Sequence, residues 1–240
     1  TATTSNTPLI AHSKGQVTMV SEGKEVVLGI QNLGDIVLIV SHPGIPNIFA
    51  LFAAEGTWTL YEIHDQKAQF LLQAGDKLLQ FTCGDFHVDG ALLAAGTNDG
   101  HIKVFETVSG KVASSIPVGQ SQVNKIKFAL NGYWVFVLSG EGLALQTLDV
   151  LDLRKSKIVH TIKGEIEDFD VDSSSSVVVT ALERTLALHR YYKKGKKWEN
   201  NLVETALDQP LSMLFLQDEE NGLNVIGLTP DAQVKAYTLN

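Results

Sequence analysis

The stretch Phe86–Glu106, "FHVDGALLAAGTNDGHIKVFE", decides the fold because its pattern recurs along the chain. An aromatic residue leads into an Asp-Gly turn, an apolar run follows, and Asn-Asp-Gly introduces an alternating segment. Phe86–Gly90 is matched by Phe128–Gly132, 42 residues later, and by Phe169–Ser173 after a further 41 residues. A fixed period of about 40–45 residues is typical of propeller blades.

Two looser copies extend the series in both directions. One lies at Met213–Gly222, where Glu220 and Asn221 belong to the turn, and the other runs from Val40 to Ala54. About five units are therefore recognisable from residue 40 onward, whereas residues 1–40 match no unit. We interpret residues 1–240 as one propeller domain.

Each unit is predicted to contain four short strands. In the unit that opens at Gln80, they are Gln80–Phe86, the apolar run Ala91–Ala95, the alternating segment His101–Glu106, and Lys111–Val118. Asn98 to Gly100 form a strong hairpin signal, because Asn and Gly tolerate the positive φ that such turns require. The sequence thus predicts an all-β fold of four-stranded antiparallel sheets, which bury their apolar faces by packing around an axis.

Three specific expectations follow from the repeats. Phe86, Phe128 and Phe169 should occupy equivalent buried positions in consecutive units. At least one of Tyr133 and Trp134 should be a core residue, since both follow a turn in an apolar strand. The third strands of three units are predicted at Thr57–Glu62, His101–Glu106 and Gln233–Leu239.

Composition restricts the possible functions. The chain has 240 residues, of which 44% are hydrophobic, and its longest apolar run, Ile48–Ala54, is too short to cross a bilayer. Cys83 is the only cysteine, so an internal disulfide and a cysteine-based zinc site are excluded. A net charge of −8 disfavours direct DNA binding and favours protein partners. A start at Thr1 instead of a methionine favours a piece of a longer protein.

The unit resembles a WD40 repeat in which most Trp-Asp pairs have been replaced. The pairs that stand at the corresponding positions are Tyr61 and Glu62, Phe105 and Glu106, Leu151 and Asp152, and Tyr237 and Thr238. The resemblance therefore depends on the period and the turns more than on the signature dipeptide, and it implies a WD40-like β-propeller.

A narrower resemblance covers roughly residues 57–165 and the last ten residues. Phe86–Gly90, the Phe-x-x-Asn-Gly-Tyr motif at Phe128–Tyr133, the Asp-Leu-Arg-Lys motif at Asp152–Lys155 and the ending "DAQVKAYTLN" are similar to the propeller of the pre-mRNA-processing factor of the Nineteen complex. This chain differs by carrying extra residues between Gly132 and Asp152.

The resemblance implies a fold and a function. Family propellers have seven blades, so seven are expected here, some of them short, although the period predicts fewer in 240 residues. The family's protein is a nuclear splicing factor that forms a homo-tetramer through a coiled coil and carries ubiquitin-ligase activity in a U-box. Both elements lie outside this chain. The propeller is its non-catalytic, partner-binding module, and its expected partners are spliceosomal proteins, including RNA-binding splicing factors.

No residue pattern predicts a catalytic, metal or cofactor site. Asp168, Asp170 and Asp172 resemble the start of a calcium loop, but the glycine and glutamate that such a loop requires are missing. The repeat alignment instead places these acids on one face of a strand. His87 and Asp99 are expected to form hydrogen bonds inside a blade.

The candidate partner-binding residues lie in "HRYYKKGKKWENN", His189 to Asn201, where aromatic and basic residues alternate. They are Arg190, Tyr191, Tyr192, Lys193 and Trp198. This composition suits stacking and charge contacts with RNA, but the overall acidity of the chain favours a solvated hairpin whose aromatics pack on the blade. The preferred function is a protein-interaction platform; the alternatives are a ligand-binding or enzymatic site at the propeller axis and a WD40 scaffold of another complex.

Overall fold

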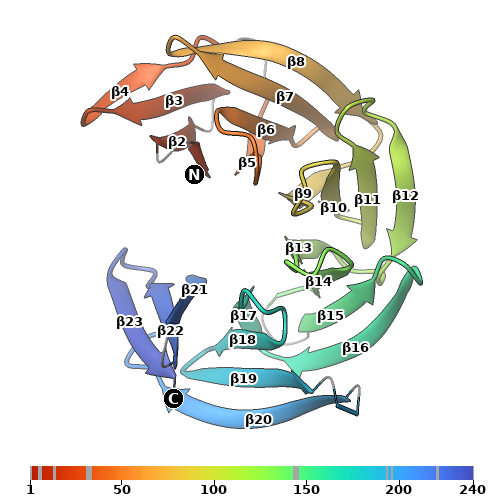
Figure 1. Cartoon of the computed structure of the whole chain (residues 1–240), viewed down its shortest axis with the longest axis vertical. Coiled ribbons are helices and arrows are strands. Elements are labelled where there is room, and N and C mark those ends of the chain that lie inside the picture. Colours follow the sequence, from red (N-terminus) through yellow and green to blue (C-terminus); the bar gives the residue numbers. More distant parts are fainter. Residues whose placement is uncertain are drawn as a thin grey trace. The chain divides into compact units, whose positions relative to one another are not determined.

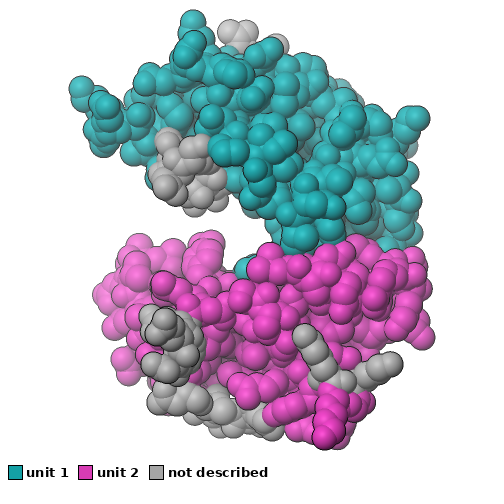
Figure 2. Space-filling view, in the orientation of Figure 1, with its two compact units in different colours: residues 1–128 teal, residues 129–240 magenta. Residues whose placement is uncertain are grey.

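The structure is a computed structural model that describes residues 2–4, 7–12, 15–30, 34–142, 146–192, 194–195, 197–219 and 222–239. All regular secondary structure in these ranges is β (Figure 1). The chain divides into two compact units, residues 1–128 and residues 129–240, which Figure 2 distinguishes by colour. Among the described residues, no helix has the length and apolar character needed to cross a membrane.

Unit 1 contains three antiparallel sheets, each with four strands in chain order. The first is β1 (Ala2–Thr4), β2 (Thr7–His12), β3 (Gln16–Ser21) and β4 (Lys24–Val27). The second is β5 (Ile36–Ser41), β6 (Ile48–Ala53), β7 (Thr57–His64) and β8 (Lys67–Gly75). The third is β9 (Phe81–Phe86), β10 (Leu92–Thr97), β11 (His101–Glu106) and β12 (Val112–Pro117). The unit ends with β13 (Val123–Phe128), which lies beside β9.

Unit 2 continues the same arrangement, and the boundary between the units follows β13, the first strand of the fourth sheet. That sheet includes β14 (Trp134–Ser139), β15 (Gln146–Asp152) and β16 (Lys157–Gly164). The fifth sheet is β17 (Ile166–Val171), β18 (Val177–Leu182), β19 (Thr185–Tyr192) and β20 (Lys197–Ala206). The sixth has three strands: β21 (Met213–Glu219), β22 (Gly222–Leu228) and β23 (Val234–Leu239).

The expectation of seven four-stranded blades is wrong. The described strands form six sheets of three or four strands. Four strands and their turns use about 42 residues, so 240 residues hold about 5.7 periods (240/42), which fits five four-stranded sheets and one three-stranded sheet. The repeat period predicted this limit, whereas the number seven came from the family resemblance alone. Residues 1–40, which matched no repeat, form β1 to β4 and most of β5.

The apolar second strands form the core, as expected for strands that are covered on both faces. Every described side chain of β14 is buried, and five of the six in β6 are buried. Phe49, Phe52 and Trp58 are fully buried in unit 1, and Phe136 and Phe169 are fully buried in unit 2. The three predicted third strands are confirmed as β7, β11 and β23.

The predicted repeat register is correct for two phenylalanines and wrong for the third. Phe86 and Phe128 end β9 and β13, and in each case the next residue begins a turn closed by a backbone hydrogen bond. In the fifth sheet the equivalent turn begins at Asp172, so Val171 is the counterpart of Phe128. Phe169 is buried as predicted, but it lies two residues earlier in the repeat.

Two of the three aspartates that resemble a calcium loop, Asp168 and Asp170, connect neighbouring strands, whereas Asp172 accepts hydrogen bonds within its own turn. Asp168 accepts a hydrogen bond from the Leu214 N–H at 2.7 Å, and Asp170 accepts one from the Leu216 N–H at 2.8 Å. These bonds join β17 to β21, the first strands of adjacent sheets. Buried carboxylates are stable in such a place because the backbone N–H groups satisfy them.

Candidate protein-binding pocket

An asparagine turn sets the start of β14. The Asn131 side-chain oxygen accepts hydrogen bonds from the N–H groups of Tyr133, at 3.1 Å, and Trp134, at 3.0 Å. The Asn131 N–H donates to the Ser175 hydroxyl at 3.1 Å, which ties this turn to the one before β18. Asn is favoured in turns because its side chain can satisfy nearby backbone donors. The turn therefore fixes two aromatic residues at one end of the sheet.

A buried carboxylate holds an arginine beside the first of these aromatics. Asp152, at the end of β15, is only 1% exposed, and it accepts hydrogen bonds from the Arg154 side chain at 2.8 and 3.1 Å. The Arg154 guanidinium carbon lies 3.7 Å from the centre of the Tyr133 ring, a cation–π contact. The ammonium of Lys155 lies 3.6 Å from Asp152. The hydrogen bonds from Arg154 hold the pKa of Asp152 below its usual range.

Three aromatic rings from three strands meet opposite this ion pair. Trp134 contacts Tyr191 with ring centres 4.9 Å apart and Trp198 with ring centres 5.7 Å apart. Tyr191 on β19 and Trp198 on β20 are cross-strand neighbours, so both side chains lie on the same face of the sheet. His160 of β16 stacks against Trp198, with the ring planes 7° apart.

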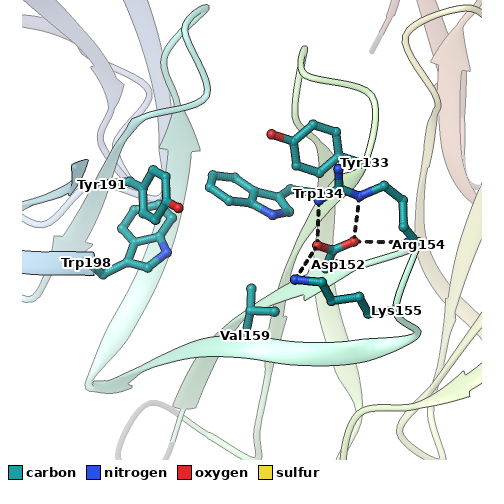
Figure 3. A pocket seen from close by; sticks show the side chains of 8 residues that line it. All are labelled: Tyr133, Trp134, Asp152, Arg154, Lys155, Val159, Tyr191 and Trp198. Carbon is teal, nitrogen blue, oxygen red and sulfur yellow. Dashed lines mark hydrogen bonds and ion pairs between the residues drawn. The ribbon is translucent and has the colours of Figure 1, made fainter. Parts of the chain in front are cut away.

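These groups line a pocket of about 330 Å³ (Figure 3). In Figure 3, Trp134 points toward Tyr191 and Trp198, while Arg154 lies next to Tyr133 and Asp152. The lining residues are Tyr133, Trp134, Asp152, Arg154, Lys155, Val159, Tyr191 and Trp198. A second depression of about 240 Å³ shares Tyr133, Trp134 and Tyr191 and is otherwise lined by Asn131 and Ser174–Ser176. We call the two together the aromatic pocket.

The predicted partner-binding residues are divided between two faces of the β19–β20 hairpin. Tyr191 and Trp198 line the aromatic pocket, but Arg190 and Tyr192 alternate with Tyr191 along β19 and point to the opposite face. Both of these side chains are exposed. Lys193 lies outside the described residues.

Sequence reasoning missed half of the pocket. Tyr133 and Trp134 were treated only as core candidates; Trp134 is indeed buried, at 7% exposure, which confirms that expectation. Asp152, Arg154 and Lys155 were noted only as a family motif. The signal that links the two groups is the β14–β15 register, in which Trp134 pairs with Asp152. The connection between these strands, residues 140–145, is longer than a two-residue hairpin turn, so its sequence does not fix that register.

The other polar residues singled out in the sequence form local hydrogen bonds. The Nδ1 atom of His87 lies 2.6 Å from a carboxylate oxygen of Asp89. Asp99 accepts a hydrogen bond from the Thr97 hydroxyl at 2.5 Å. The expected role of His87 and Asp99 inside a blade is confirmed. Within the described ranges, no group of three or more His, Cys, Asp or Glu residues could hold a metal ion.

The chemistry of the aromatic pocket is that of recognition. Its walls are aromatic rings with polar edges, and its charged groups are an arginine held by a buried carboxylate and a lysine. Pockets of this composition bind by burying an apolar side chain while a few placed polar groups fix its orientation.

Comparison with known proteins agrees with the fold and the motifs. Residues 46–131 match the model of the anaphase-promoting complex subunit 4 WD40 domain. The β-propeller domain of Cps50 (Swd1) from Myceliophteria thermophila superposes with a TM-score of 0.73 at 12% identity, covering 98% of this chain and 80% of that one. Sqt1 from Saccharomyces cerevisiae superposes with a TM-score of 0.70 at 18% identity, covering 97% of this chain and 69% of that one. These likenesses show the WD40 propeller fold.

Sequence relatives point to one kind of WD40 protein. Pre-mRNA-processing factor 19 of Schizosaccharomyces pombe is 32% identical over 47% of this chain and 23% of its own length. The Saccharomyces cerevisiae protein of the same name is 24% identical over 84% of this chain and 42% of its own length. The Arabidopsis thaliana homolog 2 is 25% identical over 67% of this chain and 29% of its own length. The aligned part of this chain thus spans less than half of each relative. The resemblance predicted from the motifs is confirmed: the chain has a WD40 propeller fold and is similar in sequence to pre-mRNA-processing factor 19.

Proposed function

We propose that this domain is a non-catalytic protein-interaction platform of a nuclear pre-mRNA splicing factor. The observation that carries the proposal is the alignment with pre-mRNA-processing factor 19 of Saccharomyces cerevisiae, which extends over 84% of this chain. A similarity that covers nearly the whole domain favours a shared role for the domain, in addition to a shared fold.

The physical properties of the domain support this proposal. A rigid all-β scaffold holds its turns at fixed positions, so a partner docks with little loss of conformational entropy. The aromatic pocket places Trp and Tyr rings beside an arginine, and these residue types dominate binding hot spots. The net charge of −8 favours proteins over nucleic acid as direct partners.

The proposal extends to a longer protein and to particular partners. The parent protein would carry a U-box ubiquitin ligase and a coiled coil that forms a tetramer, and this domain would bring spliceosomal proteins or substrates to it. An RNA-binding splicing protein is the partner that we propose first. The surface is the β19–β20 hairpin, with Tyr191 and Trp198 on the pocket face and Arg190, Tyr192 and Lys193 as additional candidates.

The test is affinity purification from nuclear extract with the tagged domain as bait, read by mass spectrometry. The control bait is an unrelated WD40 domain of similar net charge. We expect spliceosomal proteins to be enriched on this domain and not on the control. Recovery of the same proteins by both baits, or of no splicing protein, would overturn the proposal.

A further inference from the structure

We propose that the aromatic pocket binds an extended peptide segment that places an aromatic or large aliphatic side chain within two residues of an aspartate or glutamate. This proposal deepens the function proposed above and rests on it. It assigns the chemistry of the bound segment, which neither the fold nor the relatives specify.

The size of the pocket argues for one large side chain. Its larger depression, at about 330 Å³, lies at the lower end of the range for small-molecule sites, which is about 300–1,000 Å³. Its walls are the rings of Trp134, Tyr191 and Trp198, which favour offset or edge-on contact with an aromatic guest. The adjoining depression of about 240 Å³ gives the neighbouring residues of an extended segment a place beside Asn131 and the serine turn.

The charge of the pocket argues for one carboxylate next to that side chain. Arg154 and Lys155 carry two positive charges, and the buried Asp152 offsets one of them. The remaining charge of about +1 matches a single carboxylate, whereas a phosphorylated side chain carries about −1.5 to −2. The Arg154 and Lys155 side chains are each 58% exposed, so both can contact a ligand while they remain near Asp152.

The arrangement of the arginine makes it a preorganised contact. Two side-chain hydrogen bonds to Asp152 and the contact with the Tyr133 ring fix the guanidinium plane. A fixed guanidinium loses little rotamer entropy on binding and presents its remaining N–H groups in a planar fork that suits a carboxylate.

Single-stranded RNA is the competing occupant, because bases also stack on aromatic rings. Three observations favour a peptide. The buried Asp152 reduces the positive charge that a phosphate chain would need, and the chain as a whole carries −8. The neighbouring depression is lined by neutral hydroxyl and amide groups and contains no lysine or arginine among its described residues.

The test selects random twelve-residue peptides by display on the whole 240-residue chain. We expect the selected peptides to share an apolar or aromatic residue within two positions of Asp or Glu. A consensus without an acid, a basic consensus, or no enrichment would overturn the proposal. In a selected peptide, replacing the apolar anchor by Ala should weaken binding more than about 30-fold, the effect of losing a hot-spot residue.

Variants of the domain locate the site. The pair Arg154→Gln and Lys155→Gln should weaken the selected peptide, whereas the charge-matched pair Lys157→Gln and Lys163→Gln on β16, outside the pocket lining, should not. Lys155→Gln alone leaves the Arg154–Asp152 ion pair in place, so the variant should remain folded, and it should weaken binding about two- to five-fold. An equal loss of peptide affinity in the two double variants would overturn the assignment of the peptide to this pocket.

Two of the three tryptophans, Trp134 and Trp198, line the pocket, so intrinsic fluorescence reports occupancy directly. An oligo(U) of twelve nucleotides that changes this fluorescence and displaces the peptide at equal or lower concentration would replace the proposal with RNA binding. If the peptide binds but nuclear extract yields no splicing proteins, the splicing function fails and the ligand class stands. If nuclear extract yields splicing proteins but no peptide binds, the peptide assignment fails and the splicing function stands.

Discussion

At the scale of single residues, the Asp152–Arg154 ion pair makes the free energy of unfolding depend on pH in the acid range. The pKa of Asp152 is lower in the folded state than in the unfolded chain, so the folded state binds fewer protons. Its contribution is complete above the ordinary carboxyl pKa of about 4 and is lost as the pH falls through the lower folded-state pKa.

The variant Asp152→Asn isolates this contribution. The other carboxyl groups titrate in both the variant and the wild type, so their effect cancels in the comparison. At neutral pH the variant should melt at a lower temperature than the wild type. As the pH falls below about 4 the two melting temperatures should begin to converge, and they should coincide only below the lowered folded-state pKa of Asp152, where the wild-type carboxylate is protonated. Melting curves recorded across the acid range measure the difference, and parallel curves would show that the pair does not affect stability.

Cys83 gives a second prediction at this scale. Burial raises the pKa of its thiol to about 12, so almost no thiolate is present near neutral pH. Native protein treated with a thiol-specific disulfide reagent at mildly alkaline pH should show no fast reaction, and the same protein in denaturant should react fully. Rapid modification before denaturation would contradict the burial of this side chain.

At the scale of turns and strands, Gly90 is a sensitive position. Its φ is +73°, and a Cβ there would lie 1.9 Å from the His42 ring, which itself accepts hydrogen bonds from the N–H groups of Gly44 and Ile45. Gly23 has φ +75° and no atom within 4 Å of the same position. Gly23→Ala should therefore cost only the backbone strain, about 1–2 kcal/mol. Gly90→Ala should cost more, because His42 must move.

Chemical denaturation of both variants separates strain from steric overlap. The difference between the two free energies of unfolding reports the contact with His42, since the two glycines have nearly the same φ. If Gly90→Ala is no less stable than Gly23→Ala, the His42 ring moves away at no measurable cost.

The positions of the strands were largely predictable from the sequence. One error, in the alignment of the fifth sheet with the other repeats, shows why the exact repeat register was not. Turns marked by glycine, such as Gly90 and Gly132, located β9 and β13 correctly. In the fifth sheet, Ser175 takes the positive φ that a glycine holds elsewhere, so no glycine marks the turn. A shift of two residues keeps every side chain on its own face, so the burial of Phe169 could not reveal the error.

The candidate site was only half predictable for a related reason. Tyr191 and Trp198 lie in one hairpin, and their aromatic-basic pattern is visible in the sequence. Tyr133 and Arg154 meet because β14 pairs with β15 in the register that places Trp134 opposite Asp152. Gly140 and Gly142 mark the turn between these strands but do not fix that register. Local residue patterns show where a hairpin turns, whereas the register that brings Tyr133 to Arg154 depends on how the two strands pair.

At the scale of the whole molecule, the repeating sequence unit predicts the architecture, and the length of the chain limits the number of sheets. The period of about 42 residues predicted the all-β fold, and the same period leaves room in 240 residues for the six sheets that are described. A blade count transferred from relatives ignored this limit. Physical length should therefore be weighed before a family's number is adopted.

The charge of the whole chain leads to a last prediction about nucleic acid. With a net charge of −8 and a pI near 5.3, the chain repels a duplex except where cations gather. Arg190, Lys194 and Lys197 are exposed cations of the β19–β20 hairpin. Non-specific binders have Kd values of about 10⁻⁴–10⁻⁶ M at physiological salt, and we expect this chain to bind random duplex DNA more weakly than that range in filter-binding assays. Micromolar binding that falls steeply with added salt, and that is abolished when these three cations are replaced by Gln, would show instead that the hairpin overcomes the acidity of the chain.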